Sequence, residues 1–323
     1  MVITPHELHG VMAMMPAFAT ADGGDIRSTA TIDVDNVAEG VDRMIRDGAD
    51  AIATMGSFGE CSTLLLDEFK TLTTAAVDAV RKRVPLLIGC TSPGAREAVQ
   101  KLEFIRDSGA DGALVGVPYY FPMTVDNAVQ FYQDIAELFP TLGIVGYHNP
   151  PLHRVRLPVS AVQKMAQSRN MVAMKDSHRT PIEFMELWEK TRDKMSIFVS
   201  QNQLYPYADW GAVGCWSIDV WMGPWPVLRL RNAVRDHDEE TAKEIIFGMS
   251  ATRSHGSEEM AWRETGHKIA QEIAGYCKPG PLRAPYTHVP DRVIEFQRKR
   301  ANLWLELCAR YRPEVEAAAT AAV

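Results

Sequence analysis

The sequence lacks a long hydrophobic run near its N-terminus. The longest strongly apolar stretch there, Val11–Phe18, is too short to span a membrane and has no basic flank. It therefore matches neither a membrane span nor an export signal, and we expect a cytoplasmic protein with no membrane partner.

Positive charge is also in short supply. The 323 residues include 34 Lys and Arg against 41 Asp and Glu, which gives a formal net charge of -7. A protein whose main partner is nucleic acid or an anionic membrane usually carries an excess of basic residues. The balance argues against both kinds of partner.

Neither cysteine nor histidine is grouped as a metal site requires. The five cysteines are odd in number and none has the close spacing of a zinc or redox motif, which is typical of reduced thiols in a cytosolic protein. They are Cys61, Cys90, Cys215, Cys277 and Cys308. The nine histidines form no obvious ligand cluster, so the sequence predicts neither a metal nor another bound cofactor.

The sequence alternates between short apolar runs and longer amphipathic segments. The runs predicted as strands are Gly10–Met15, Ala51–Thr54, Pro85–Gly89, Gly112–Val117, Gly143–Tyr147, Met171–Lys175, Ile197–Ser200 and Gly214–Ser217. The segments predicted as helices are Val37–Asp47, Asp67–Arg81, Ala95–Ser108, Val125–Leu138, Val159–Gln167 and Pro181–Arg192. Eight strands with intervening helices predict an α/β protein with a (β/α)8 fold, a TIM barrel. The seventh connection, near Gln203–Trp210, is shorter than the others.

After Gly223-Pro224 the pattern predicts helices only. They are Trp225–Arg235, Glu239–Ser254, Ser257–Tyr276 and Pro290–Tyr311. We therefore predict a catalytic barrel over residues 1–224 and a C-terminal helical extension over residues 225–323 that packs on it.

Lys175 ends the apolar run Met171–Met174, at the end of the sixth predicted strand. A lysine in a partly desolvated barrel mouth has its ammonium form disfavoured, and the neutral amine attacks ketones to form a Schiff base. The alternative is a lysine that only extends its stem along the strand end toward solvent.

Other strand ends also carry chemically useful residues, as expected where active sites of such barrels lie. The loop after the second strand, Gly56–Leu64, has two glycines whose free N–H groups suit a carboxylate, although a well-capped turn is the alternative. Tyr147 ends the fifth strand, where its phenol can relay protons near Lys175 or serve only in packing.

These motifs resemble a known superfamily over about His9 to Asp219. It comprises the class I, Schiff-base-forming aldolases and lyases related to dihydrodipicolinate synthase and N-acetylneuraminate lyase. Gly56–Glu60 is similar to the family's Gly-Thr-Thr-Gly-Glu motif, and Tyr147–Pro150 and Lys175 match two further motifs. The resemblance implies that Lys175 is the Schiff-base lysine and Tyr147 the catalytic tyrosine.

The same resemblance assigns roles to residues near this pair. The backbone amides of Ser57 and Phe58 would hold the carboxylate of a pyruvate-like unit. Ser57 and Tyr120 would take part in the proton relay beside Tyr147. Family members are commonly tetramers, which implies a homo-oligomer here.

Departures from the family pattern indicate a branch. Phe58 replaces a threonine of the synthases, and Leu152 stands where they place an arginine. Aromatic residues instead gather in segments expected at the mouth, which suits an aryl group better than a polyol. We expect the substrate to contact Trp216 and the adjacent Ser217, as well as Trp221.

Three stretches resemble the hydratase-aldolases that act on benzylidenepyruvates in polycyclic aromatic hydrocarbon degradation. They are Arg27–Asp33, Gly56–Cys61 and Gly280–Tyr286. The resemblance implies that water and an ortho-substituted trans-benzylidenepyruvate are converted to an aryl aldehyde and pyruvate. No metal is required, because the iminium on Lys175 accepts the electrons.

Three alternatives to a hydratase-aldolase remain open. They are another pyruvate-dependent lyase or synthase of the superfamily, a keto-acid dehydratase, and a ligand-binding regulator on a barrel. The ortho substituent is likewise open. His148 is a candidate substrate contact, although strand-end neighbours alternate in direction.

Overall fold

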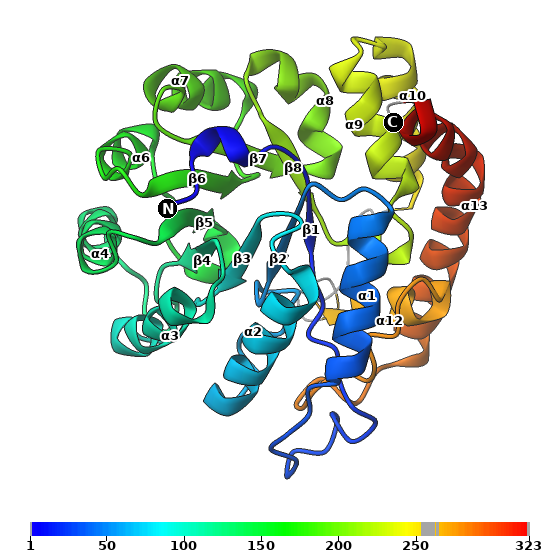
Figure 1. The fold of residues 1–323 in the computed structure, drawn as a ribbon, viewed down its shortest axis with the longest axis horizontal. Helices are drawn as coiled ribbons and strands as arrows, with labels where there is room; N and C mark the ends of the chain where they lie inside the picture. Colours follow the sequence, from blue (N-terminus) through cyan, green and yellow to red (C-terminus); the bar gives the residue numbers. More distant parts are fainter. Residues whose placement is uncertain (1, 253–261, 263–264, 322–323) are drawn as a thin grey trace. The chain divides into compact units, whose positions relative to one another are not determined.

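The computed structural model describes residues 2–252, 262 and 265–321. Eight parallel strands close into a barrel in chain order (Figure 1), which confirms the predicted TIM barrel. The strands are β1 Gly10–Met14, β2 Ala51–Thr54, β3 Leu86–Gly89, β4 Gly112–Gly116, β5 Gly143–His148, β6 Met171–Asp176, β7 Ser196–Ser200 and β8 Gly214–Ser217.

Nearly every residue of the eight strands is buried, and most of these residues are apolar. Parallel strands of a barrel are covered inside by side chains and outside by helices, which favours continuous hydrophobic runs. Closure also depends on glycine. A Cβ added at Gly214 would lie 2.1 Å from the carbonyl oxygen of Gly10, so the last strand approaches the first only without a side chain there.

The helices between the strands confirm the six predicted ones. They are α1 Val34–Arg46, α2 Leu66–Val80, α3 Ala95–Ser108, α4 Val125–Leu138, α6 Val159–Met165 and α7 Pro181–Thr191. Side chains of Asp33, Thr124 and Thr180 accept the N-terminal hydrogen bonds of three of them. Gly109 ends α3 in the left-handed conformation at φ 91°, as its position after the helix predicts.

Two short helices complete the connections. α5, Pro150–His153, follows β5 directly. The seventh connection holds only α8, Leu204–Tyr207, between the 3-10 turns η2 Gln201–Gln203 and η3 Ala208–Trp210. Its short length agrees with the weak helical pattern of the sequence there.

The C-terminal region is helical, as predicted. It contains α9 Trp225–Arg235, α10 Glu239–Ala251, α12 His267–Ala274 and α13 Asp291–Ala321. The ends predicted near Ser254 and Ser257 lie outside the described residues. α13 continues past the predicted end at Tyr311, because Glu-Ala-Ala-Ala residues after Pro313 have high helix propensity.

The chain forms two compact units. The first joins the N-terminal residues through Met12 with Asp50–Gly56 and Arg81–Trp216. The second joins Ala13–Ala49, Ser57–Val80 and the chain from Ser217 onward. The predicted division at residue 224 remains a prediction.

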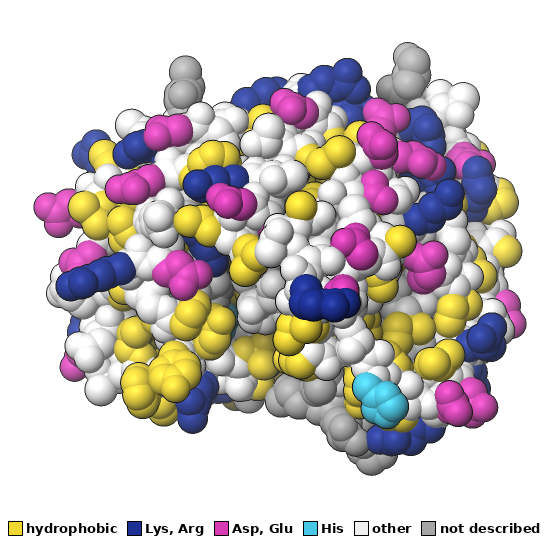
Figure 2. All heavy atoms as spheres, turned by 90° about the horizontal axis from the view of Figure 1, so that it is seen from below, with side chains coloured by type: hydrophobic (Ala, Val, Ile, Leu, Met, Phe, Trp, Pro, Cys, Tyr) yellow, Lys and Arg dark blue, Asp and Glu magenta, His cyan; other side chains and the backbone are white. Residues whose placement is uncertain are grey.

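The described surface carries charges of both signs. On the face drawn in Figure 2, Lys and Arg side chains are interspersed with Asp and Glu and with patches of hydrophobic atoms. Within the described residues, no helix has both the length and the apolar character needed to cross a membrane.

Candidate active site

Three side chains of the first unit lie at equivalent places on their strands. Tyr147, Lys175 and Trp216 are each the last residue but one of β5, β6 and β8. The carboxyl ends of barrel strands share one end of the barrel, where active sites of this fold lie. These three residues, although far apart in the sequence, therefore lie at the same end of the barrel.

The amine of Lys175 lies between two aromatic rings. Its Nζ is 4.0 Å from the centre of the Tyr147 ring and 3.7 Å from the centre of the Trp216 ring. Tyr147 and Lys175 are paired in register across β5 and β6, and each is only 5% exposed. The structure thus brings together three of the predicted site residues.

The phenol of Tyr147 is held by residues that follow it in the chain. Asn149 Nδ2 donates to the phenol oxygen at 2.9 Å. His153 packs its ring edge-on against Tyr147, with ring centres 4.8 Å apart. Burial, with a contribution from the charge of Lys175, lowers the pKa of His153 to about 3. His153 is therefore neutral and packs against Tyr147 without adding charge.

This packing requires glycine on the neighbouring strand. A Cβ added at Gly116 would lie 2.5 Å from His153 Cε1 and 2.7 Å from Thr91 Oγ1. Gly116 also pairs in register with Tyr147. The close approach of β4 fixes His153 behind the phenol.

His148 does not join the Lys175–Tyr147 pair, and the expectation that it contacts substrate is corrected. It pairs in register with Asp176, and successive strand residues project to opposite sides. Its Nε2 accepts from the backbone N–H of Leu157 at 3.1 Å, and its Nδ1 lies 3.0 Å from Asp176 Oδ1. Because Nε2 accepts, Nδ1 carries the ring proton and points it at the carboxylate.

Asp176 connects this histidine to the loop after β6. Its Oδ2 lies 2.6 Å from Arg179 Nε, and Arg179 donates to the carbonyl of Leu157 at 2.9 Å. Burial would raise the pKa of Asp176, but the hydrogen bond from His148 and the charge of Arg179 lower it to about 2. Arg179 is buried as well. The network braces the loops that follow the strands of Tyr147 and Lys175.

Tyr120 lies elsewhere. Its side chain is 66% exposed and packs edge-on against Phe121, itself 75% exposed, with ring centres 4.9 Å apart. Because the Lys175–Tyr147 pair is buried, this exposed ring is not part of it within the single chain. The expected relay through Tyr120 remains a prediction.

Ser57 and Phe58 belong to the second unit. They lie in the turn after β2, where Phe58 is buried and packs edge-on against His267 at 6.2 Å between ring centres. The predicted carboxylate contacts of Ser57 and Phe58 remain a prediction.

Ser217 and Trp221 also belong to the second unit. Ser217 Oγ accepts from the backbone N–H of Val220 at 3.2 Å, within the 3-10 turn η4, Asp219–Met222. Trp221 is fully buried, with its ring edge-on to Phe18 at 5.8 Å between centres. It is a core residue of this unit, which corrects its expected place at the mouth.

This burial predicts the effect of truncating Trp221. Trp221→Ala should lower the free energy of unfolding by about 3–5 kcal/mol, because it leaves a large cavity in a packed core. Urea unfolding followed by circular dichroism measures the change. An unfolding free energy within about 1 kcal/mol of the wild type would contradict the core assignment.

The sequence missed two contributors to the site. Asn149 and His153 follow Tyr147 within the Tyr-His-Asn-Pro segment and the short helix after it. Their proximity in the sequence was visible, but only the structure shows that they contact or brace the pair. No group of three or more His, Cys, Asp or Glu side chains arranged to hold a metal is found among the described residues.

Comparisons with known proteins identify the family of the chain. The model of the dihydrodipicolinate synthetase family matches residues 20–292. A trans-O-hydroxybenzylidenepyruvate hydratase-aldolase of Pseudomonas aeruginosa is 30% identical, with 97% of each chain covered. A trans-2'-carboxybenzalpyruvate hydratase-aldolase of Nocardioides sp. (strain KP7) is 24% identical, with 96% of each chain covered. A solved structure described as "PhdJ bound to substrate intermediate" matches with a TM-score of 0.91 and 27% identity, covering 96% of this chain and 99% of that one.

The chain belongs to the dihydrodipicolinate synthetase family. It is an enzyme of the class I pyruvate aldolases, which are carbon–carbon lyases.

Proposed function

We propose that this enzyme is a Schiff-base hydratase-aldolase. Its substrates are water and an ortho-substituted trans-benzylidenepyruvate, and its products are an aryl aldehyde and pyruvate. The observation that carries the proposal is the buried amine of Lys175 between the rings of Tyr147 and Trp216. The names of the relatives support the substrate class.

The first step joins substrate to enzyme. The neutral amine of Lys175 attacks the ketone carbon of the 2-oxo acid and gives a carbinolamine. Tyr147 donates its phenolic proton to the departing hydroxyl, which leaves as water and forms the iminium. The hydrogen bond from Asn149 to the phenol oxygen orients Tyr147 and helps to stabilise the phenolate.

The iminium then serves two reactions. It draws electrons through the conjugated alkene, so water adds at the benzylic carbon and the resulting enamine is protonated at the adjacent carbon. Deprotonation of the benzylic alcohol breaks the bond between these carbons, and the iminium accepts the electron pair. An aryl aldehyde leaves, the enamine takes up a proton, and hydrolysis frees pyruvate and Lys175. The covalent lysine adduct serves as electron sink, so we propose no separate cofactor.

Trp216 supports the aryl part of the proposal. Its ring offers a flat apolar surface beside the reacting amine. Its indole Nε1 is buried and has no hydrogen-bond partner among the described residues. An aromatic ring of the substrate suits the flat surface of Trp216, and an oxygen substituent suits its indole N–H.

A turnover assay tests the function. The assay compares ortho-hydroxy- and ortho-carboxybenzylidenepyruvate. Its readouts are the loss of enone absorbance and the release of aldehyde and pyruvate. Stoichiometric aldehyde and pyruvate from either compound supports the proposal. Turnover of a deoxy-keto acid with loss of water only would identify a dehydratase, and no turnover of either benzylidenepyruvate would contradict the proposed substrate. A cytoplasmic location, a role in aromatic hydrocarbon degradation and assembly as a homotetramer stay predictions.

Replacing Trp216 tests the aryl specificity. Trp216→Ala should lower kcat/KM for a benzylidenepyruvate by about 1–3 kcal/mol in transition-state free energy, the size of hydrophobic pocket discrimination. Trp216→Phe is the matched control, because it keeps an aromatic surface and removes the indole N–H. The measurement is the ratio of kcat/KM for an aryl and a small aliphatic enone acid. If Trp216→Ala leaves this ratio unchanged, the aryl assignment is wrong.

A further inference from the structure

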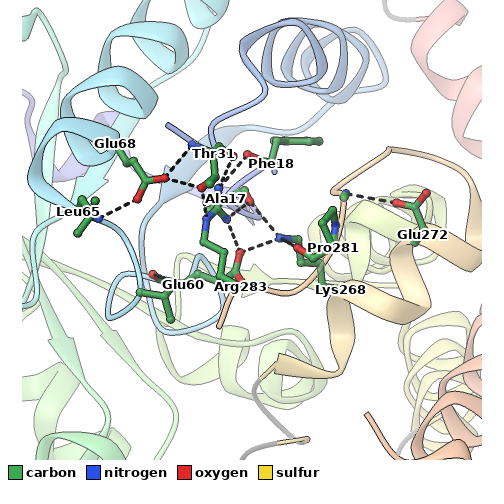
Figure 3. Close-up of polar contacts among 12 residues, drawn as sticks. Ala17, Phe18, Thr31, Glu60, Leu65, Glu68, Lys268, Glu272, Pro281 and Arg283 are labelled. Carbon is green, nitrogen blue, oxygen red and sulfur yellow. Dashed lines mark hydrogen bonds and ion pairs between the residues drawn. The ribbon is translucent and has the colours of Figure 1, made fainter. Parts of the chain in front are cut away.

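The three stretches that resemble hydratase-aldolases meet in one buried network of the second unit. Figure 3 shows Glu60 from Gly56–Cys61, Arg283 from Gly280–Tyr286 and Thr31 from Arg27–Asp33 joined by hydrogen bonds and ion pairs. The side chains of Glu60 and Arg283 are 5% and 4% exposed. Segments far apart in the sequence therefore share one desolvated polar cluster.

Arg283 uses its entire guanidinium group in this network. An arginine has five N–H donors in a planar fork. Arg283 makes five hydrogen bonds, of which one reaches Glu60 Oε2 at 2.7 Å and two reach the hydroxyl and carbonyl of Thr31. The remaining two go to the carbonyls of Ala17 and Phe18. This saturation fits a structural brace and leaves no donor for a ligand.

Lys268 completes the charge balance around Glu60. Its three N–H donors reach Glu60 Oε2 at 2.8 Å and the carbonyls of Pro281 and Ala17 at 2.7 and 3.2 Å. Burial lowers the pKa of Lys268, and the charge of Glu60 opposes that shift. Lys268 and Arg283 carry two positive charges, and Glu60 supplies only one negative charge. Thr31, which binds Arg283, donates to the carboxylate of Glu68, and this carboxylate offsets the second positive charge.

Glu60 transmits this bracing to the backbone of the turn after β2. Its φ is 54°, a left-handed conformation that is uncommon for a residue other than glycine. Its backbone N–H donates to the carbonyl of Ser57 at 3.2 Å, and its carbonyl accepts from Thr63 at 2.9 Å. Its carboxylate also accepts from the backbone N–H of Arg283 at 3.1 Å. The side chain thus holds a strained residue that is hydrogen-bonded directly to Ser57.

We infer that the Glu60–Lys268–Arg283 network is a positioning device for substrate carboxylate binding. It fixes the backbone of Ser57–Glu60, and with it the amides of Ser57 and Phe58. The three residues do not touch substrate and act through the turn. This inference rests on the proposed function and on the expectation, implied by the family resemblance, that those amides hold the carboxylate of the 2-oxo acid.

The test compares two ketones that differ in the carboxylate. Pyruvate and acetone are each trapped on the full-length enzyme with borohydride, and the ketone concentration that gives half-maximal labelling is measured. In Glu60→Gln the charge of the brace is removed, and in Thr31→Val only one hydroxyl is lost. The milder Thr31→Val keeps the test usable if Glu60→Gln does not fold. Glu316→Gln is the matched control, since Glu316 forms an exposed pair with Arg312.

For Glu60→Gln, we expect the pyruvate concentration that gives half-maximal labelling to be at least about 10-fold higher than for the wild type. Small misplacements of binding groups have large effects. Thr31→Val should change in the same direction, whereas acetone labelling and Glu316→Gln should match the wild type. Equal changes for both ketones, or no change for pyruvate in any folded variant, would overturn the inference alone. A wild-type enzyme that traps neither ketone would overturn the proposed function, and this inference with it.

Discussion

Incubation with pyruvate and borohydride is expected to add a reduced pyruvyl group to Lys175 and to abolish turnover. Borohydride reduces the iminium to a stable secondary amine, so each modified enzyme has lost its nucleophile. Lys175 is selected because its amine is buried at the end of β6, with the Tyr147 ring 4.0 Å away. Peptide mass mapping locates the adduct, and the extent of labelling should equal the loss of activity.

Two lysine variants sharpen this experiment. Lys175→Ala should form no adduct and lack measurable turnover. Lys190→Ala, at an exposed position of α7, should be labelled and inactivated like the wild type. An adduct on another lysine, or persistent turnover in Lys175→Ala, would rule out the Schiff-base mechanism at this residue.

Tyr147→Phe is expected to lower kcat by about 10²–10⁴-fold, the usual contribution of a positioned proton-transfer group. The substitution keeps the ring that packs against His153 and removes only the hydroxyl that Asn149 binds. Thermal unfolding should change little, because only one hydroxyl is removed. Steady-state kinetics with a benzylidenepyruvate measures the effect.

Tyr132→Phe provides the matched control. Tyr132 lies on α4, and its buried hydroxyl donates to the carbonyl of Val115 on β4 at 2.8 Å. This hydrogen bond has a structural role. This variant should lose about 0.5–1.5 kcal/mol of stability, the net value of one hydrogen bond, and keep its turnover. A Tyr147→Phe enzyme with more than about half of wild-type turnover would exclude the expected 10²-fold role of this phenol.

Part of the candidate site could be predicted from the local sequence pattern, and part depends on the packing of the folded chain. The sequence predicted where the strands end, because apolar runs stop at the barrel mouth. Lys175, Tyr147 and Trp216 lie near three of these ends, and the structure shows the amine of Lys175 beside both rings. Which side a strand-end residue faces depends on register, and the register sends His148 to Asp176 instead of the amine. The pattern alone could not decide this, since a single-residue shift exchanges the two faces.

The aromatic residues illustrate the same limit. Trp216 and Trp221 are five positions apart and both looked suited to an aryl pocket. Trp216 contacts Lys175, whereas Trp221 is fully buried against Phe18 in the second unit. Hydrophobic character predicts that a tryptophan is buried but does not say against which neighbours.

By itself, the sequence determined the barrel, the family and the Lys175–Tyr147 pair, because these depend on local periodicity and on motifs contained in short segments. The tertiary structure decided which residues support them. The ion pair of Glu60 with Arg283 joins positions more than two hundred residues apart, and Asp176, His148 and Arg179 form a network through buried contacts. A charged side chain in a sequence is ordinarily taken as exposed. Only the folded chain shows where burial is offset by a complete set of partners.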